Sequence, residues 1–161
     1  DAASSRATVD LAQRHPDVFA ALAMHPHVAA QATEQAMIGL RALAAHPKVV
    51  AIGETGLDYA RADGLREAQR AVFVRHIHLS RDLGLPLIIH CRDAYPEVLE
   101  ILRREGGDRV IMHAFAGAPD VAQECVRRGY TIALGGLVTF RNARAAVEVA
   151  RDVPLESLLV E

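Results

Sequence analysis

The stretch VVAIGE, residues 49–54, is a continuous apolar run that ends in a glycine and a carboxylate. An unbroken apolar run, rather than alternation with polar residues, is typical of a strand in a parallel sheet whose two faces are covered by helices. Residues 49–53 are therefore a predicted strand. Five runs of the same kind, and thus five more predicted strands, lie at residues 18–24, 87–90, 109–113, 130–134 and 158–161.

Helical patterns occupy the intervals between these strands. The clearest spans residues 65–83, where apolar side chains recur every three or four positions. Pro96 and Pro119 each fall in the first turn of a further predicted helix, a position that proline suits. Asn142 is a predicted N-cap of a helix that ends before Pro154. Strands that alternate with helices in this way predict an α/β domain.

Length and composition are those of one soluble domain. The chain has 161 residues, of which 51% are hydrophobic and 24% charged, so we expect a single domain over residues 1–161. A formal net charge of −2 excludes a broad basic field for sequence-independent binding of nucleic acid. We expect no membrane span, no signal peptide and a cytoplasmic location, and the sequence indicates no protein partner. Cys91 and Cys125 form no CxxC pair, which argues against a thiolate zinc site.

Three predicted strands lead directly into residue types that bind metal ions, namely Glu54, His90 and His113. In a parallel α/β fold the carboxyl ends of the strands face a common crevice or barrel mouth. Each residue alone has an ordinary explanation, as a salt-bridge partner or a hydrogen-bonded rim residue. Their coincidence at equivalent strand ends favours a metal site. Oxygen and nitrogen donors suit a divalent ion such as Mg, Mn or Zn.

Other basic side chains favour structural roles. His15 and His46 each precede a proline, which pushes them toward extended geometry, so both mark junctions between a helix and a strand. His76 lies on the apolar stripe of its predicted helix and is expected to pack there. The only lysine, Lys48, begins a strand instead of ending one. This position argues against the hydrolases in which a carboxylated lysine bridges two metal ions.

Four segments of the chain resemble signature segments of one known family. They are AIGETGLDY at 51–59, PLIIHCRDA at 86–94, MHAFAG at 112–117 and VTFRN at 138–142, and in this order they are similar to the TatD family. The resemblance covers nearly the whole chain. It implies a TIM-barrel, metal-dependent hydrolase, typically a deoxyribonuclease that acts from DNA ends with divalent metal ions.

The same resemblance implies roles for particular residues. It makes Glu54 a catalytic carboxylate shared by the metal ions, of which two are expected in the complete protein. His90 and His113 become metal ligands, and His25 matches a family segment near the substrate. Arg92 follows His90 directly and could hold a substrate phosphate. The alternative, that it pairs with the adjacent aspartate to fix the loop, stays open on the sequence alone.

The chain departs from the family pattern at both ends. The family begins its first strand with a His-x-His pair that binds one metal ion, and this chain starts after that position. Residues 158–161 look like the strand that the family continues into Thr-Asp, whose aspartate is another ligand. A complete (β/α)8 barrel needs roughly 250 residues and eight strands. We therefore expect an incomplete TIM-type barrel of about six parallel strands, with at most three metal ligands.

Two other functions remain open at this point. One is a different amidohydrolase-type barrel that acts on a small ester or amide. The other is an inactive module that binds a phosphate group or nothing. No Gly-x-Ser-x-Gly elbow, P-loop or Gly-x-Gly-x-x-Gly segment is present in the sequence, so serine-hydrolase, nucleotide-triphosphatase and dinucleotide functions lack support.

Overall fold

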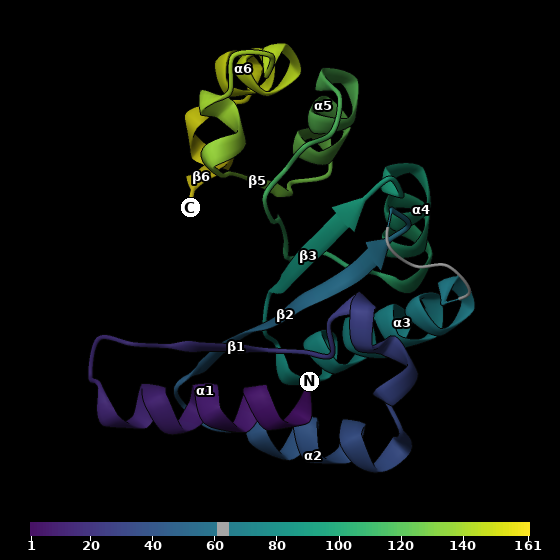
Figure 1. The fold of residues 1–161 in the computed structure, drawn as a ribbon, viewed down its shortest axis with the longest axis vertical. Coiled ribbons are helices and arrows are strands. Elements are labelled where there is room, and N and C mark those ends of the chain that lie inside the picture. Colours follow the sequence, from purple (N-terminus) through teal and green to yellow (C-terminus); the bar gives the residue numbers. More distant parts are fainter. Residues whose placement is uncertain (61–64) are drawn as a thin grey trace.

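The computed structural model describes residues 1–60 and 65–161, and strands and helices alternate along it (Figure 1). The strands are β1 (Ala20–Leu22), β2 (Val49–Asp58), β3 (Leu87–Arg92), β4 (Val110–Met112), β5 (Thr131–Leu134) and β6 (Leu158–Val160). The helices are α1 (Ala2–Arg14), α2 (Glu34–Ala44), α3 (Arg66–Leu83), α4 (Tyr95–Glu105), α5 (Pro119–Arg127) and α6 (Arg144–Asp152). The described residues also form three short 3-10 helices: η1 (Pro26–Gln31), η2 (Gly136–Thr139) and η3 (Leu155–Ser157).

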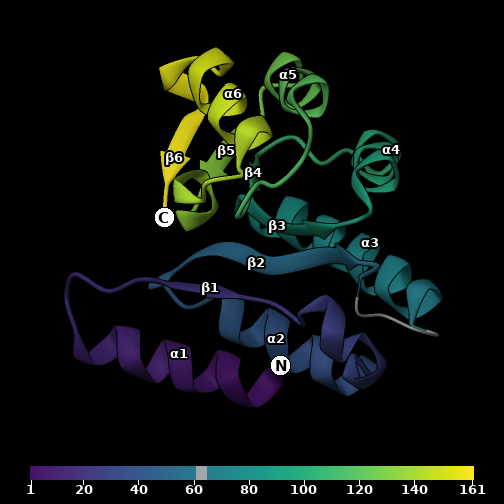
Figure 2. The same ribbon diagram turned by 45° about the horizontal axis from the view of Figure 1, so that its top comes forward.

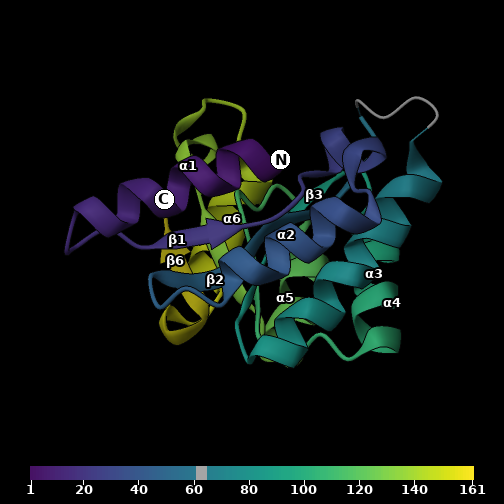
Figure 3. The same cartoon turned by 90° about the horizontal axis from the view of Figure 1, so that it is seen from below.

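The strands form one parallel sheet in chain order, from β1 to β6. The α-helices follow one another along an arc outside the curved sheet (Figure 2), and α1 and α2 pack against each other beside β1 and β2 (Figure 3). This is the arrangement of a TIM-type barrel that is not closed within the described residues. The α/β class is confirmed, but the helices cover one face of the sheet, where the apolar runs alone suggested both. The carboxyl ends of the strands share one rim.

Strand β2 is longer than the sequence predicted. The expected end at Gly53 is wrong, because β2 continues to Asp58 and pairs with β3 along this extension. Gly56 lies opposite His90, and a Cβ atom on Gly56 would lie only 2.0 Å from the carbonyl oxygen of His90. A glycine is thus required at position 56 for the close approach of β2 and β3. Gly56 lies within β2 and does not end it. Glu54 consequently lies inside the strand instead of after it.

Helix α3 packs the predicted apolar stripe against the sheet. Val72 and Leu79 of that stripe are buried in the core, and so are Phe73 and Ile77 beside it. The helix ends at Gly84, which adopts the left-handed conformation with φ of 64°. His76 is fully buried, as its place on the stripe predicted. Each large apolar side chain buried in this way stabilises the fold by about 1.5–3 kcal/mol.

The junctions and the last helix complete the comparison with the sequence. His46 accepts a hydrogen bond from the backbone N–H of Lys48 at its Nδ1 atom (3.1 Å), and Lys48 Nζ donates to the carbonyl oxygen of His15 (3.0 Å). Both histidines therefore lie at junctions, as expected. Asn142 is not the N-cap of α6: its carbonyl oxygen accepts a hydrogen bond within the preceding turn, and Ala143 takes the N-cap position. None of the helices in the described ranges is long and apolar enough for a membrane crossing.

Candidate metal centre

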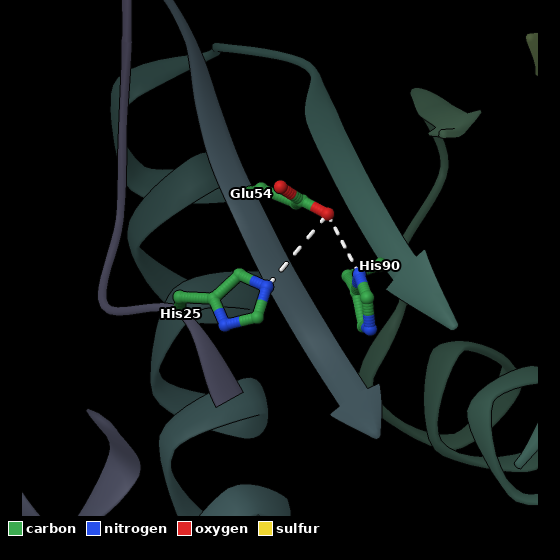
Figure 4. Close-up of side chains that lie close together, drawn as sticks. All are labelled: His25, Glu54 and His90. Atoms are coloured by element: carbon green, nitrogen blue, oxygen red, sulfur yellow. Dashed lines mark hydrogen bonds and ion pairs between the residues drawn. The ribbon is translucent and has the colours of Figure 1, made fainter. Parts of the chain in front are cut away.

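Three imidazoles, from β3 and from the segments after β1 and β4, surround one oxygen atom, Oε1 of Glu54 on β2. His90 on β3 places its Nδ1 atom 2.7 Å from this oxygen. His113, directly after β4, places Nε2 at 3.5 Å. His25, which follows β1, places Nε2 at 3.8 Å. Figure 4 shows His25 and His90 on either side of the Glu54 carboxylate. The structure thus brings together the three predicted metal ligands, and it places His25, which was expected near the substrate, beside them.

The surrounding imidazoles keep the carboxylate of Glu54 ionised. Hydrogen bonds from His25 and then His90 hold the pKa of Glu54 far below its usual range, although partial burial opposes this shift. Burial by itself lowers the pKa of His90, but hydrogen bonds to Glu54 and Asp58 outweigh burial and raise it. The Glu54 side chain is 32% exposed, so solvent can reach it. The result is an accessible anion surrounded by nitrogen donors.

A second group of ionisable side chains shares His90 with the first. Asp58 Oδ2 lies 2.7 Å from His27 Nε2 and 3.0 Å from His90 Nε2. The other carboxylate oxygen of Asp58 accepts a hydrogen bond from the backbone N–H of Ala60 at 3.1 Å. The Asp58 side chain is only 1% exposed. The geometry would admit a cation in either group, His25–Glu54–His90 or His27–Asp58–His90.

Neither Asp58 nor His27 was singled out by the sequence analysis, although a signal for each was present. Asp58 comes four residues after Glu54, and even spacing on a strand places side chains on the same face. Because the predicted strand ended at Gly53, Glu54 and Asp58 were not expected to lie on the same strand face. His27 is two residues after His25, and their rings meet edge to face with centroids 4.4 Å apart.

The ring of His113 is oriented by a further carboxylate. Glu161, directly after β6, places Oε2 2.5 Å from His113 Nδ1, and its Oε1 accepts a hydrogen bond from the backbone N–H of Ala114 at 2.5 Å. A carboxylate that accepts the Nδ1–H of an imidazole leaves the Nε2 lone pair free, and Nε2 is the atom that faces Glu54. Glu161 thereby fixes the orientation of the His113 ring, with Nε2 on the side of Glu54.

Arg92 is exposed at the rim, whereas the two cysteines are buried. Arg92, at the end of β3, is exposed, and within the described ranges no hydrogen bond or ion pair links it to Asp93. Contact with a substrate phosphate stays a prediction for Arg92. Cys91 and Cys125 are buried, and burial raises the pKa of Cys91 to about 12 and that of Cys125 to about 11, so both remain neutral thiols. The available donor set consists of oxygen and nitrogen.

A curved parallel α/β sheet with imidazoles and a carboxylate gathered at its carboxyl rim is the arrangement of TIM-barrel proteins, whose functional groups lie at that rim. The family model described as TatD related DNase matches residues 1–161 of this chain. The chain belongs to the TatD family.

Individual relatives agree with this assignment. The chain is 40% identical over 155 residues to an uncharacterized metal-dependent hydrolase, YabD, of Bacillus subtilis, a match that covers 95% of this chain and 61% of the relative. It is 43% identical to an uncharacterized metal-dependent hydrolase named TatD of Mycobacterium tuberculosis (100% and 63%), and 34% identical to a 3'-5' ssDNA/RNA exonuclease TatD of Enterobacter lignolyticus (98% and 62%). The chain therefore spans less than two thirds of the length of these relatives.

A solved structure supports the same fold. The TatD homolog YjjV of Escherichia coli K12 superimposes with a TM-score of 0.93 at 30% identity, over 99% of this chain and 63% of that chain. The β1–β6 sheet and its helices thus correspond to 63% of that TatD homolog. The expected six-stranded, incomplete TIM-type fold is confirmed.

Proposed function

We propose that this chain is part of a divalent-metal-dependent hydrolase that cleaves phosphodiester bonds of DNA, working inward from an end of the strand. One observation carries the proposal: three imidazole nitrogens lie within 3.8 Å of a single ionised carboxylate oxygen, Glu54 Oε1. Glu54, His90 and His113 are the proposed metal ligands, and Glu54 is also the proposed catalytic carboxylate. His25 is close enough to assist binding of the ion or of the substrate.

The donor set is compatible with Mg, Mn or Zn and incompatible with a thiolate site. Carboxylate oxygen and imidazole nitrogen are the donors present, and both cysteines are protonated in the core. A divalent ion held there supplies positive charge for the phosphate and lowers the pKa of a bound water. Two ions in the complete protein remain part of the proposal. Lys48 cannot bridge them, because its ammonium group donates to the carbonyl oxygens of His15 and Val18.

Nucleic acid as the substrate is supported by the local chemistry and by the relatives. Because the chain carries a net charge of −2, binding of a phosphodiester depends on local groups instead of a broad basic surface. The exposed guanidinium of Arg92 at the same rim is the proposed phosphate contact. The name of the Enterobacter relative, a 3'-5' ssDNA/RNA exonuclease, supports single strands and end-directed cleavage.

A nuclease assay on the full-length protein tests the proposal. A single-stranded oligonucleotide labelled at its 5' end is incubated with the protein, with Mg²⁺, Mn²⁺ or EDTA. We expect stepwise shortening with either metal ion and none with EDTA. Glu54→Gln should reduce the rate by about 10³-fold or more, because a neutral amide is a poor ligand and the metal contributes several kcal/mol. Glu148→Gln, an exposed carboxylate change on α6, is the matched control.

Two results would contradict the proposal in different ways. Metal-dependent cleavage of a small ester such as p-nitrophenyl acetate, without shortening of DNA, would favour the alternative amidohydrolase-type reaction. Oligonucleotide binding without cleavage under any metal ion would favour a phosphate-binding module.

A further inference from the structure

Helix α3 carries a polar side chain that is completely buried beside the candidate metal centre. Gln69 is 0% exposed. Its Oε1 atom accepts a hydrogen bond from the backbone N–H of Asp58 at 2.9 Å, and its Nε2 atom donates to the backbone carbonyl of Asp58 at 3.2 Å. One amide thus satisfies both backbone polar groups of one residue. Such paired bonds fix the position of that residue at the end of β2.

The residue held by Gln69 contacts a proposed metal ligand. The carboxylate of Asp58 lies 3.0 Å from Nε2 of His90. Asp58 is 1% exposed and also contacts His27 and the backbone N–H of Ala60, so several contacts define its orientation. A chain of direct hydrogen bonds therefore runs from α3 through Asp58 to the ring of His90.

The two nitrogens of His90 face two different carboxylates. Nδ1 lies 2.7 Å from Glu54, and Nε2 lies 3.0 Å from Asp58. A neutral imidazole has one N–H and one lone pair. In the structure Nδ1 donates to Glu54; when a cation takes the place of that proton, an Nε2–H bond to Asp58 leaves the Nδ1 lone pair for the ion. Metal-binding histidines generally donate their other N–H to a carboxylate or a carbonyl group, which fixes the ring.

We propose that Gln69 is a positioning residue of the metal centre: it fixes Asp58, and Asp58 holds His90 with Nδ1 directed at Glu54. The proposal rests on the proposed metal site but is independent of which substrate the protein cleaves. It also assigns Asp58 to the support of a ligand and excludes it from the ligand set. Gln69 touches neither substrate nor ion and acts only through Asp58.

Manganese binding by the full-length protein tests this proposal without an activity assay. Gln69→Met removes both hydrogen bonds at nearly constant side-chain volume. Ser80→Ala is the matched control, since Ser80 is also buried on α3 and donates a hydrogen bond to a backbone carbonyl, that of Leu85, at 2.6 Å. Each variant is titrated with Mn²⁺ below its unfolding temperature, with free Mn²⁺ measured by electron paramagnetic resonance. We expect about 10–100-fold weaker binding for Gln69→Met and unchanged binding for Ser80→Ala.

The outcomes separate a positioning role from a structural one. Equal Mn²⁺ affinity of Gln69→Met and the unsubstituted protein, with only a lower melting temperature, would overturn the proposal. If the unsubstituted protein binds no Mn²⁺, the proposed function fails and the inference fails with it.

A measurement on the unsubstituted protein guards against a variant that does not fold. Nitrogen-15 spectra of the histidine rings with Mg²⁺ bound identify which nitrogen of His90 carries the proton. We expect Nε2–H, directed at Asp58. Observation of Nδ1–H would overturn the proposal whatever the variants do.

Discussion

The two groups of side chains that share His90 have almost the same donors but differ in burial. In one, Glu54 keeps a side-chain exposure of 32% and faces His25 and His113 as well as His90. In the other, Asp58 is 1% exposed and already accepts hydrogen bonds from His27 and from a backbone N–H. An accessible carboxylate can give up a hydrogen bond from an imidazole and bind a cation in its place. A buried carboxylate that is held by hydrogen bonds within the protein instead orients the side chains around it. This difference in burial supports the proposed ion site at Glu54 and the proposed supporting role of Asp58.

Removal of the shared ring should have the largest effect. His90→Ala takes a ligand from one group and leaves both carboxylates without this imidazole, so we expect Mn²⁺ affinity to fall by more than about 100-fold, beyond the loss typical of a supporting residue. Calorimetric titration of the full-length protein measures it. His78→Ala is the control, because His78 lies on α3 and pairs with Glu105. Unchanged affinity in His90→Ala would remove His90 from the site.

The segment that carries one histidine of each group is fixed by His76, and this gives a pH prediction. His76 accepts a hydrogen bond from the N–H of Met24 at Nε2 (3.0 Å), and its Nδ1 lies 2.7 Å from the carbonyl oxygen of Val72. A backbone N–H can only donate, so the ring is neutral with its proton on Nδ1. Burial lowers the pKa of His76 to about 4.

The stability that neutral His76 contributes decreases as the pH falls. Below about pH 6.5 the unfolded chain binds a proton at this position and the folded protein does not, so stability from His76 is complete above pH 6.5 and is lost as the pH falls toward 4. We expect a loss of about 2 kcal/mol in unfolding free energy between pH 7 and pH 5 relative to His76→Gln, which does not titrate. Urea unfolding of both proteins at each pH measures the difference in their unfolding free energies. The pH dependence that His90 contributes is the same in both proteins, so it cancels from this difference. Parallel pH profiles would contradict the neutral, buried assignment.

The buried carboxylate should matter less for metal binding than the accessible one. Asp58→Asn keeps the backbone clamp of Gln69 but weakens the contact with His90, so we expect Mn²⁺ binding to weaken by about tenfold. Glu54→Gln, titrated beside it, should lose far more. If the two variants lose the same affinity, or if Asp58→Asn loses more, the roles assigned to the two carboxylates are reversed.

The smallest effect is expected at His27, whose side chain is 37% exposed. His27→Gln changes a partner of Asp58 and no proposed ligand, so Mn²⁺ affinity should change by less than about threefold, the size expected of a substitution near the surface. A loss similar to that of His90→Ala would show that the ion lies between His27 and Asp58.

The sequence predicted the parts of this site that depend on where strands end. His90 and His113 follow short apolar runs, and parallel strands bring such positions to one rim, so their convergence on Glu54 could be anticipated. The parts that depend on how strands pair could not. Gly53 was interpreted as the end of a strand, but it lies where β2 passes close to Ile88 of β3, and a Cβ atom there would be 2.4 Å from the Ile88 side chain. That contact joins residues far apart in sequence, and no local pattern reveals it.

The same limit applies to Gln69. A glutamine within a helix favours a solvent-exposed position on propensity and polarity alone. Its burial becomes understandable only when the backbone of Asp58 is placed beside it, which requires the extended β2. The supporting roles of Asp58 and Gln69 therefore could not be predicted, because the predicted strand ended at Gly53 and not at Asp58.

X-ray diffraction from crystals of the full-length protein soaked in Mn²⁺ distinguishes an ion bound at Glu54 from one bound at Asp58. An anomalous difference map recorded at the manganese absorption edge locates the ion. We expect a peak in contact with Glu54 and His90, with Asp58 still hydrogen-bonded to the opposite nitrogen of that ring. A peak between His27 and Asp58, with none beside Glu54, would contradict it.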